Sequence, residues 1–475
     1  MLEAWSSLSR PTVWMVDVAW PFGLLLVLVG LLWRRVHLPS WKDIPKVSTA
    51  VAICGLWALY WTAFQFGQIT SDECVSLASD STDLIKYIRG DSGLPSRLYR
   101  TLSWFVVPLG GLAILHAFSV LMSTLSTVLL TSAGYRLAGT VGAFGTFLLL
   151  TYEPWLRYNW YARSYSLFLA FSCLALWQAT RNVSRDEPPE LGGMLLATAV
   201  ACMENPICIL VALAAIVAKV RRYGIGSVPG RSWAALMLMI GACGPMVFKA
   251  ISMHGNLAHQ VRSETYTVLI IAGFVVLPGV LRRGRRGWIS ETALLTIVAV
   301  GVATGLELIP VHERAFLFSL PWVVGGVLAS IRTHKIWQVV LAIVVGSVGL
   351  SENAGLLSKR LHQATVLADD ARSTDAYLES VSATAVHFEP RHVRYRLTSF
   401  VADLRVLKTC DEGGHAPDLP DRYRTDDKPQ CSAGEHTVTW NRKTPSCDCP
   451  MVAEYGAWRT FYCSDAASIK GMRPD

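Results

Sequence analysis

The sequence predicts an all-α polytopic membrane protein with about twelve transmembrane helices, followed by a small C-terminal module. Three observations support this fold class. Hydrophobic residues make up 52% of the 475 residues and charged residues only 16%, against roughly 25% charged in an ordinary soluble domain. Apolar runs recur over the first 350 residues, and the chain then becomes polar and irregular. Length and aromatic content exclude small disulfide-rich secreted proteins, coiled coils and disordered chains.

The transmembrane helices are expected where apolar runs of about 17 to 25 residues are bounded by charges, Gly or Pro. These criteria give spans at 13–33, 47–66, 104–130, 134–151, 164–179, 193–218, 233–251, 266–281, 290–309, 315–331 and 336–350. The run 193–218 contains Glu204-Asn205-Pro206, and an acid with a Pro is costly inside one continuous helix in hydrocarbon. We therefore expect two short helices there, which completes the transmembrane domain of residues 1–350.

Lys and Arg predict which ends of the spans face the cytoplasm. Residues 1–350 hold 27 Lys or Arg and 17 Asp or Glu, so the excess behind the net charge of +8 belongs to this part. The basic residues lie on alternate connections, at Arg34, Arg35, Lys42, Lys46, Arg181, Arg185, Lys219, Arg221, Arg222, Arg231, Arg282, Arg283, Arg285, Arg286, Arg332 and Lys335. We expect these connections in the cytoplasm, and both termini outside. Nucleic-acid binding is not expected, because the charges end apolar segments and form no solvated basic face.

Residues 351–475 are expected to form a separate module outside the membrane, either α+β or irregular. The segment 364–385 is weakly helical, and later segments punctuated by Pro and Gly favour short strands. Disulfides persist outside the cell, so we expect two bridges and one unpaired residue among Cys410, Cys431, Cys447, Cys449 and Cys463. The alternative is a zinc site at Cys447-Asp448-Cys449 with His415 or His436. The cysteines within spans are expected to be small apolar residues, namely Cys54, Cys173, Cys202, Cys208 and Cys243.

The first outer loop, residues 67–103, begins with two adjacent acids. Asp72 and Glu73 follow the end of a span, and such a pair can act as a general base or bind a cation. The structural alternative is a helix N-cap, with Ser71 followed by acids in the first turn. The rest of the loop alternates charged and apolar residues and predicts an amphipathic helix at the membrane interface.

The second outer loop, residues 152–163, combines arginines with tyrosines. Arg157 and Arg163 lie close in sequence to Tyr158, Tyr161 and Tyr165. Guanidinium groups bind phosphate bidentately, and the tyrosines can pack against a prenyl chain. The structural alternative is an aromatic belt at the membrane boundary.

The third outer loop, residues 310–314, places His312, Glu313 and Arg314 at the mouth of two spans. Arg314 alone can be explained by snorkelling to the lipid head groups. Three separate outer loops, however, carry acids, arginines or aromatic residues at the same face. We therefore expect them to form one pocket.

These motifs occur in an order that is similar to one family of membrane enzymes. An Asp-Glu pair occupies 72–73, Ala-Arg-Ser-Tyr-Ser-Leu occupies 162–167, and Glu-Arg-Ala-Phe-Leu-Phe-Ser-Leu-Pro-Trp occupies 313–322. Over residues 45–335 the chain resembles the GT-C superfamily. Within it, the chain is most similar to the branch that uses polyprenyl- or dolichyl-phosphate sugars, which includes protein mannosyltransferases and bacterial aminoarabinose transferases.

The resemblance implies an integral membrane glycosyltransferase of the plasma membrane or bacterial inner membrane. Such an enzyme moves a sugar from a polyprenyl-phosphate carrier to an acceptor on the outer face, and the acceptor can be a lipid, a glycan or a protein. The catalytic acid falls on Asp72, with Glu73 beside it. The lipid-phosphate and donor-binding residues fall on Arg163, Tyr165 and Arg314. Arg157 and His312 are further candidates for this role, from the composition of the second and third outer loops. No cofactor is expected, although oligosaccharyl relatives use a divalent metal.

The chain departs from the family pattern at one position and in two segments. Relatives commonly have an acid before the Ala-Arg motif, whereas this chain has Tyr161. Glu153 and Glu204 are the candidate auxiliary acids. The first span and the cysteine-bearing tail also lie outside the usual pattern.

Two other functions stay open: a non-catalytic GT-C-like protein in lipid binding or assembly, and a secondary transporter, which usually shows internal repeats and polar groups at mid-bilayer.

Overall fold

The fold is described from a computed structural model of the whole chain. The placement of the following residues is described: 19–37, 44–66, 97–161, 164–181, 183, 188–254, 273–305, 317–331, 369–383, 386–389, 434–440 and 449–463, with single residues at 355, 358, 362, 365, 366 and 445.

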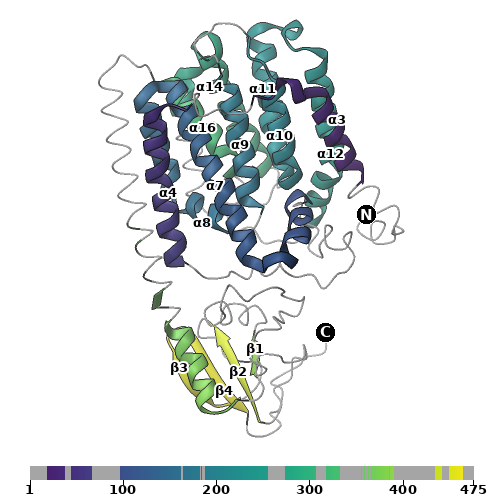
Figure 1. The fold of residues 1–475 in the computed structure, drawn as a ribbon. Coiled ribbons are helices and arrows are strands. Elements are labelled where there is room, and N and C mark those ends of the chain that lie inside the picture. Colours follow the sequence, from purple (N-terminus) through teal and green to yellow (C-terminus); the bar gives the residue numbers. More distant parts are fainter. Residues whose placement is uncertain are drawn as a thin grey trace.

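Most of the described residues are helical, and the strands lie near the C-terminus, which confirms the coarse fold prediction (Figure 1). The helical elements are α3 (Trp20–Leu32), η2 (Trp33–Arg35), α4 (Lys46–Phe66), α7 (Arg97–Leu150), α8 (Glu153–Trp160), α9 (Tyr165–Ala179), α10 (Gly192–Glu204), η4 (Pro206–Cys208), α11 (Ile209–Tyr223), η5 (Ile225–Ser227), α12 (Gly230–His254), α14 (Gly284–Gly305), η6 (Leu317–Ser319) and α16 (Leu320–Ser330). Residues 273–280 and 369–380 are also helical.

The helices α9 and α10 form the centre of the bundle. Twelve of the fifteen residues of α9 and twelve of the thirteen of α10 are buried. Both sequences are apolar on all sides, and a helix of this kind is stable only when it is surrounded by other helices. α9 packs against α7 and α10, and α10 also contacts α12 and α3. The remaining helices, including α14 with α11 and α16, complete the bundle around them.

The helix α7 is not one straight rod (Figure 1). As a straight helix its 54 residues would extend about 81 Å, and Tyr99 and Phe118 would be about 28 Å apart. Their ring centroids are instead 6.2 Å apart, so the chain folds back in the stretch that contains Pro108. It folds back again at Gly139, which has a φ of 61°. This value is readily accessible only to glycine.

The second reversal corrects the predicted connection between two spans. Spans 104–130 and 134–151 were expected to be separated near residue 132. In the structure Gly134 and Gly142 lie against each other, and a Cβ on Gly134 would be 2.6 Å from the carbonyl oxygen of Gly142. The chain therefore turns at Gly139, several residues later than the apolar pattern indicated. Because neither Gly134 nor Gly142 has a side chain, the segments of α7 before and after Gly139 can approach this closely.

The predicted break in the run 193–218 is confirmed. α10 ends at Glu204, η4 follows from Pro206, and α11 begins at Ile209. The side chain of Asn205 accepts a hydrogen bond from the backbone N–H of Ile207 at 3.2 Å. Pro206 lacks an N–H donor, which ends the hydrogen-bond ladder of α10 at this point.

Two further boundaries differ from the predictions. Within the predicted second outer loop, residues 153–160 form the helix α8, and Pro154 occupies its first turn without penalty. The span expected at 290–309 begins earlier, since α14 starts at Gly284 and includes Arg285 and Arg286. Helical residues 273–280 occupy part of the expected span 266–281, and the span 336–350 lies outside the described residues.

The perimeter of the helical bundle is strongly apolar. Exposed large hydrophobic side chains occur on many different helices, including Leu26 on α3, Trp57 on α4, Phe144 on α7, Met237 on α12 and Val302 on α14. Trp57 is 68% exposed and Leu26 is 71% exposed. Large apolar side chains exposed on several helices are typical of surfaces that contact lipid or another protein.

Two helices of the described part are long and apolar enough to cross a membrane. They are Ile114–Phe147 within α7 and Gly284–Ala303 within α14. Four shorter apolar helices accompany them, at Lys46–Tyr60, Tyr165–Ala179, Gly192–Glu204 and Leu317–Ser330. The sequence predicted about twelve spans, so the full number stays a prediction.

The C-terminal strands form one sheet in the order β1-β2-β4-β3. β1 (Val386–Glu389) pairs in parallel with β2 (Glu435–Trp440), which pairs antiparallel with β4 (Trp458–Cys463), and β4 pairs antiparallel with β3 (Met451–Tyr455). Helical residues 369–380 pack on the sheet through Ala371 and Leu378, which are fully buried. This part is therefore α+β, one of the two predicted forms.

One disulfide is present in the described part of the C-terminal module, between Cys449 and Cys463. It confirms that disulfides form here, while Cys410, Cys431 and Cys447 lie outside the described residues. An oxidised Cys449 cannot serve as the thiolate ligand that a zinc site at 447–449 would need. Of the cysteines in helical elements four are buried, as expected, but Cys54 on α4 is exposed.

Candidate functional site

A cluster of three tyrosines joins α8 to α9 at one end of the bundle. The ring of Tyr158 lies 5.7 Å from that of Tyr161 and 4.9 Å from that of Tyr165, measured between centroids. Both contacts are close to edge-on, the geometry that aromatic quadrupoles favour. We call these three residues the tyrosine cluster.

The guanidinium group of Arg157 lies over the tyrosine cluster. Its central carbon is 4.7 Å from the ring centroid of Tyr158, and Nη2 donates to the Tyr158 hydroxyl at 3.3 Å. A cation over an aromatic face is held by the ring quadrupole. Two predicted donor-binding residues, Arg157 and Tyr165, are thus brought together on one ring, although they belong to different helices.

Two serines of α7 fix the position of α8. The hydroxyl of Ser119 donates to the carbonyl of Tyr161 at 2.9 Å, and that of Ser123 donates to the carbonyl of Asn159 at 2.8 Å. Asn159 in turn donates from Nδ2 to the carbonyl of Trp155 at 2.9 Å. These buried contacts satisfy the last carbonyls of a short helix, which would otherwise lack partners.

Glu204, a candidate auxiliary acid, lies at the same end of the bundle and contacts the first turn of α7. Its side chain is 3% exposed, and Oε1 accepts a hydrogen bond from the backbone N–H of Tyr99 at 2.9 Å. Tyr99 belongs to the first turn of α7, whose N–H groups have no partner within the helix. The charges of Arg97 and Arg100 lie nearby. Glu204 therefore caps α7 across 105 positions of sequence.

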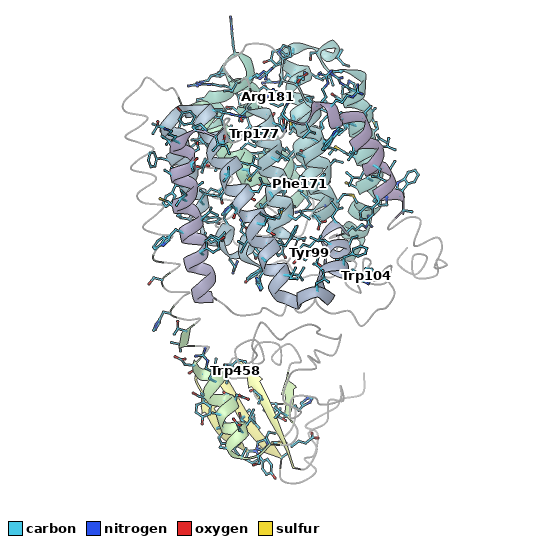
Figure 2. All side chains as sticks on the ribbon, in the orientation of Figure 1. Tyr99, Trp104, Phe171, Trp177, Arg181 and Trp458 are labelled. Carbon is cyan, nitrogen blue, oxygen red and sulfur yellow. A yellow bond between two sulfur atoms is a disulfide. The ribbon has the colours of Figure 1, made fainter. Side chains whose placement is uncertain are left out.

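The opposite end of the bundle carries most of the described basic side chains. Figure 2 shows Tyr99 and Trp104 toward one end, and Trp177 and Arg181 toward the other, with Phe171 between them. α9 runs from Tyr165 to Ala179 and therefore connects the tyrosine cluster with the opposite end. α10 runs antiparallel to α9. Its first residue, Gly192, packs against the side chain of Arg35, and its last residue, Glu204, lies at the end with the tyrosine cluster. We call the end with Arg35 and Arg181 the basic end.

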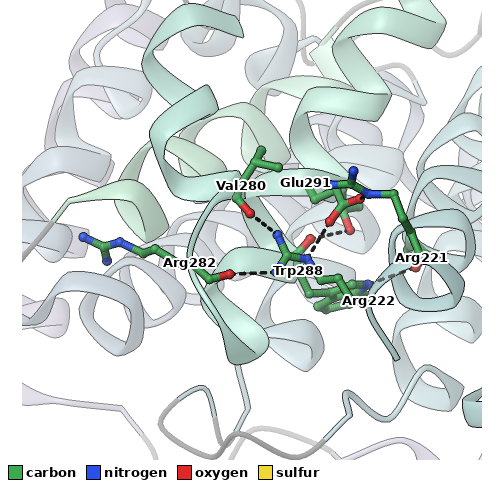
Figure 3. A network of polar contacts seen from close by, with 8 residues as sticks. Arg221, Arg222, Val280, Arg282, Trp288 and Glu291 are labelled. Carbon is green, nitrogen blue, oxygen red and sulfur yellow. Dashed lines mark hydrogen bonds and ion pairs between the residues drawn. The ribbon is translucent and has the colours of Figure 1, made fainter. Parts of the chain in front are cut away.

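A buried acid at the basic end binds two arginines. Glu291 on α14 is 2% exposed and forms ion pairs with Arg221 and Arg222 of α11 (Figure 3). Arg222 also donates to the carbonyl of Arg282 at 2.7 Å and to that of Val280. Sequence reasoning did not single out Glu291. The available signal was an acid placed a few residues inside an apolar helix, which is costly unless it is paired.

Other cations of the basic end donate to backbone carbonyls of neighbouring connections. Lys219 Nζ donates to the carbonyl of Pro189 at 2.7 Å, and Arg285 Nη1 donates to that of Arg181 at 2.5 Å. Arg35 forms an ion pair with Glu190 at 2.8 Å. The connections that were predicted to share one side of the membrane therefore meet at one end of the bundle.

Five predicted site residues lie outside the described residues: Asp72, Glu73, Arg163, His312 and Arg314. Glu153 is the first residue of α8. The structure thus places Arg157, Tyr165 and Glu204 at one end of the bundle, and it links the first two through Tyr158. Tyr161, which replaces an acid of the resembled family, packs on Tyr158. Among the described residues there is no group of three His, Cys, Asp or Glu suited to a metal ion.

Comparisons of this chain with known protein-family models, with curated proteins and with solved structures gave no match. The residues of the site themselves indicate which ligands it can bind. A half-buried guanidinium and the hydroxyls of a tyrosine cluster are donors that suit a phosphate or a sugar. They lie at the end of a bundle whose perimeter is apolar.

Proposed function

We propose that the protein is a multi-pass membrane glycosyltransferase that takes a sugar from a polyprenyl-phosphate carrier and transfers it on the extracytoplasmic face. The observation that supports this function best is the contact of Arg157 and Tyr165 with Tyr158. It joins two predicted donor-binding residues, Tyr165 from the family motif and Arg157 from the composition of the second outer loop, at the end opposite the basic end. The apolar perimeter supports the membrane location.

In the proposed reaction the acceptor hydroxyl or amine attacks the anomeric carbon of the carrier-bound sugar. Asp72 removes the proton of the attacking group, a general-base role that contributes about 10²- to 10⁴-fold. Arg163 and Arg314 bind the leaving polyprenyl phosphate and stabilise its growing charge. Arg157, beside the tyrosine cluster, supplies a further donor to the phosphate, and no metal is required for these steps.

The test uses the full-length chain in detergent with a panel of radiolabelled polyprenyl-phosphate sugars. Release of polyprenyl phosphate is measured for the wild type, Asp72→Asn and a control in the same loop, Asp80→Asn. We expect Asp72→Asn to lower turnover by at least 10²-fold, and the control to retain it. Normal turnover in Asp72→Asn would remove the assigned base.

A second candidate function is a non-catalytic protein that binds carrier lipid in the same pocket. The feature that favours it is Tyr161, which occupies the position of a family acid and packs within the tyrosine cluster. The same experiment separates the two functions. Binding of polyprenyl-phosphate sugar without turnover, weakened by Arg157→Ala but not by Asp72→Asn, would support the lipid-binding protein.

A further inference from the structure

The cations of the basic end form two layers. The inner layer consists of Lys219, Arg222, Arg282 and Arg285, which all donate to backbone carbonyls of the protein itself. Glu291 adds an ion pair that holds Arg222 in place (Figure 3). Because these contacts join connections that are far apart in sequence, they fix the positions of the neighbouring side chains.

The outer layer consists of five arginines. Within the described part of the chain their side chains form no hydrogen bond or ion pair, and all are at least partly exposed. They are Arg34, Arg181, Arg231, Arg283 and Arg286. The described acids of this end, Glu190 and Glu291, are already bound to other arginines. The outer layer therefore presents charge that the described protein does not neutralise.

The electrostatic environment at this end agrees with an excess of positive charge. The pKa of His37 lies below its ordinary value, first because of burial and second because of the nearby charge of Arg181. Arg35 lowers the pKa further, while Glu190 raises it. Burial and the neighbouring guanidinium groups thus both disfavour a further positive charge on this imidazole.

Exposed apolar side chains lie next to the outer arginines in sequence. Trp33, which is 57% exposed, precedes Arg34, and Leu281, which is 86% exposed, lies two residues before Arg283. An apolar side chain beside an unpaired arginine is the arrangement found at the boundary between hydrocarbon and lipid head groups. A soluble anion would be attracted by the charge but would gain nothing from the apolar neighbours.

We propose that the outer layer binds the phosphate groups of anionic membrane lipids. The inner layer fixes the backbone of the connections that carry the outer arginines, so less backbone order has to be gained on binding. This inference rests on the membrane location in the proposed function, but it does not depend on sugar transfer. Each arginine near an anionic lipid surface is expected to strengthen binding about fivefold.

The test follows thermal unfolding of the full-length chain in neutral detergent while phosphatidylglycerol, phosphatidylcholine or inorganic phosphate is added. We expect phosphatidylglycerol to raise the unfolding temperature more than phosphatidylcholine, and salt to reduce the difference. Arg283→Gln with Arg286→Gln should weaken phosphatidylglycerol binding about 25-fold. The matched control, Arg372→Gln with Arg459→Gln, removes the same charge from the C-terminal module and should leave binding unchanged.

Three outcomes would overturn the proposal. Equal effects of the two lipids would show that charge is not recognised. A full effect of inorganic phosphate would assign the site to a free anion. Equal weakening in the control would show a response to net charge only.

If the Arg283 and Arg286 variant fails to fold, Arg34→Gln with Arg231→Gln takes its place. A different result would contradict the membrane location itself: neither lipid changes the unfolding temperature, and the chain is soluble without detergent.

Discussion

Glu204 shows how one side chain can determine where a distant helix begins. The buried side chain accepts the N–H of Tyr99, one of the first N–H groups of α7, which have no partner within the helix. The residues that precede α7 belong to the loop that begins with Asp72 and Glu73. A cap at this position therefore fixes the N-terminus of α7.

Replacing Glu204 tests the cap directly. Glu204→Ala leaves the buried N–H of Tyr99 without an acceptor, and we expect a loss of about 1–3 kcal/mol in stability. Glu204→Gln keeps an acceptor oxygen and should lose less. Thermal unfolding of the full-length chain measures both, with Glu190→Gln as a control, since that acid is exposed and its pair with Arg35 contributes about 0–1 kcal/mol. Equal effects of the three variants would contradict the assigned cap.

His436 makes the stability of the C-terminal sheet depend on pH. It lies on β2 with its ring 4.8 Å from that of Tyr462, and burial lowers the pKa of His436. Below about pH 6.5 the unfolded chain binds a proton that the folded sheet binds less readily. The sheet therefore loses stability as the pH falls through this range, until the lower pKa of the folded state is passed.

His436→Phe removes the titrating group and should remove this part of the pH dependence. Limited proteolysis of the full-length chain, read by mass spectrometry of peptides from 435–463, measures it at pH 7.5 and 5.5. The wild type should become easier to cleave relative to His436→Phe at the lower pH. Comparing the two chains at each pH cancels the effect of pH on the protease. An unchanged ratio would contradict the prediction.

At the scale of elements, the reversal inside α7 depends on glycine. A Cβ at position 142 would collide with the carbonyl oxygen of Gly134, which is backbone and cannot move away independently. We expect Gly142→Ala to cost about 1–3 kcal/mol, measured as a lower unfolding temperature. Gly301→Ala on α14 is the matched control, because a Cβ there meets nothing within 4 Å. An unchanged unfolding temperature in Gly142→Ala would show that the segments of α7 before and after Gly139 lie farther apart than in this structure.

Local signals predicted some elements and missed others. The break at 204–206 followed from an acid and a proline in one apolar run, and both act on the chain locally. The turn at Gly139 was misplaced, because the stretch 132–142 holds several glycines and polar residues, and only the fold shows that the chain reverses at Gly139. α8 was read as a loop because its aromatic residues also suit a membrane belt. Its contacts with Ser119 and Ser123 come from tertiary packing.

At the scale of the whole molecule, the sequence predicted which connections lie together but not what holds them there. Alternating Lys and Arg grouped these connections on one side, and the contacts of Arg285 and Lys219 confirm that they share one end. The pairing of Glu291 could not be derived, because it depends on how α11 packs against α14. Likewise, the arginines and tyrosines of the second outer loop predicted that Arg157 and Tyr165 share one site, whereas the cap by Glu204 required the fold.

The shortness of the two central helices has a consequence for how a lipid would reach the site. α9 rises about 22 Å and α10 about 20 Å, whereas the hydrocarbon layer is about 30 Å thick. Other helices surround both of them, so the bilayer cannot thin to match. If the bundle spans a bilayer as proposed, the connections at the ends of the central pair lie within the thickness of the membrane. In the proposed function, a carrier head group would then reach these connections from within its own leaflet, without first leaving for the aqueous phase.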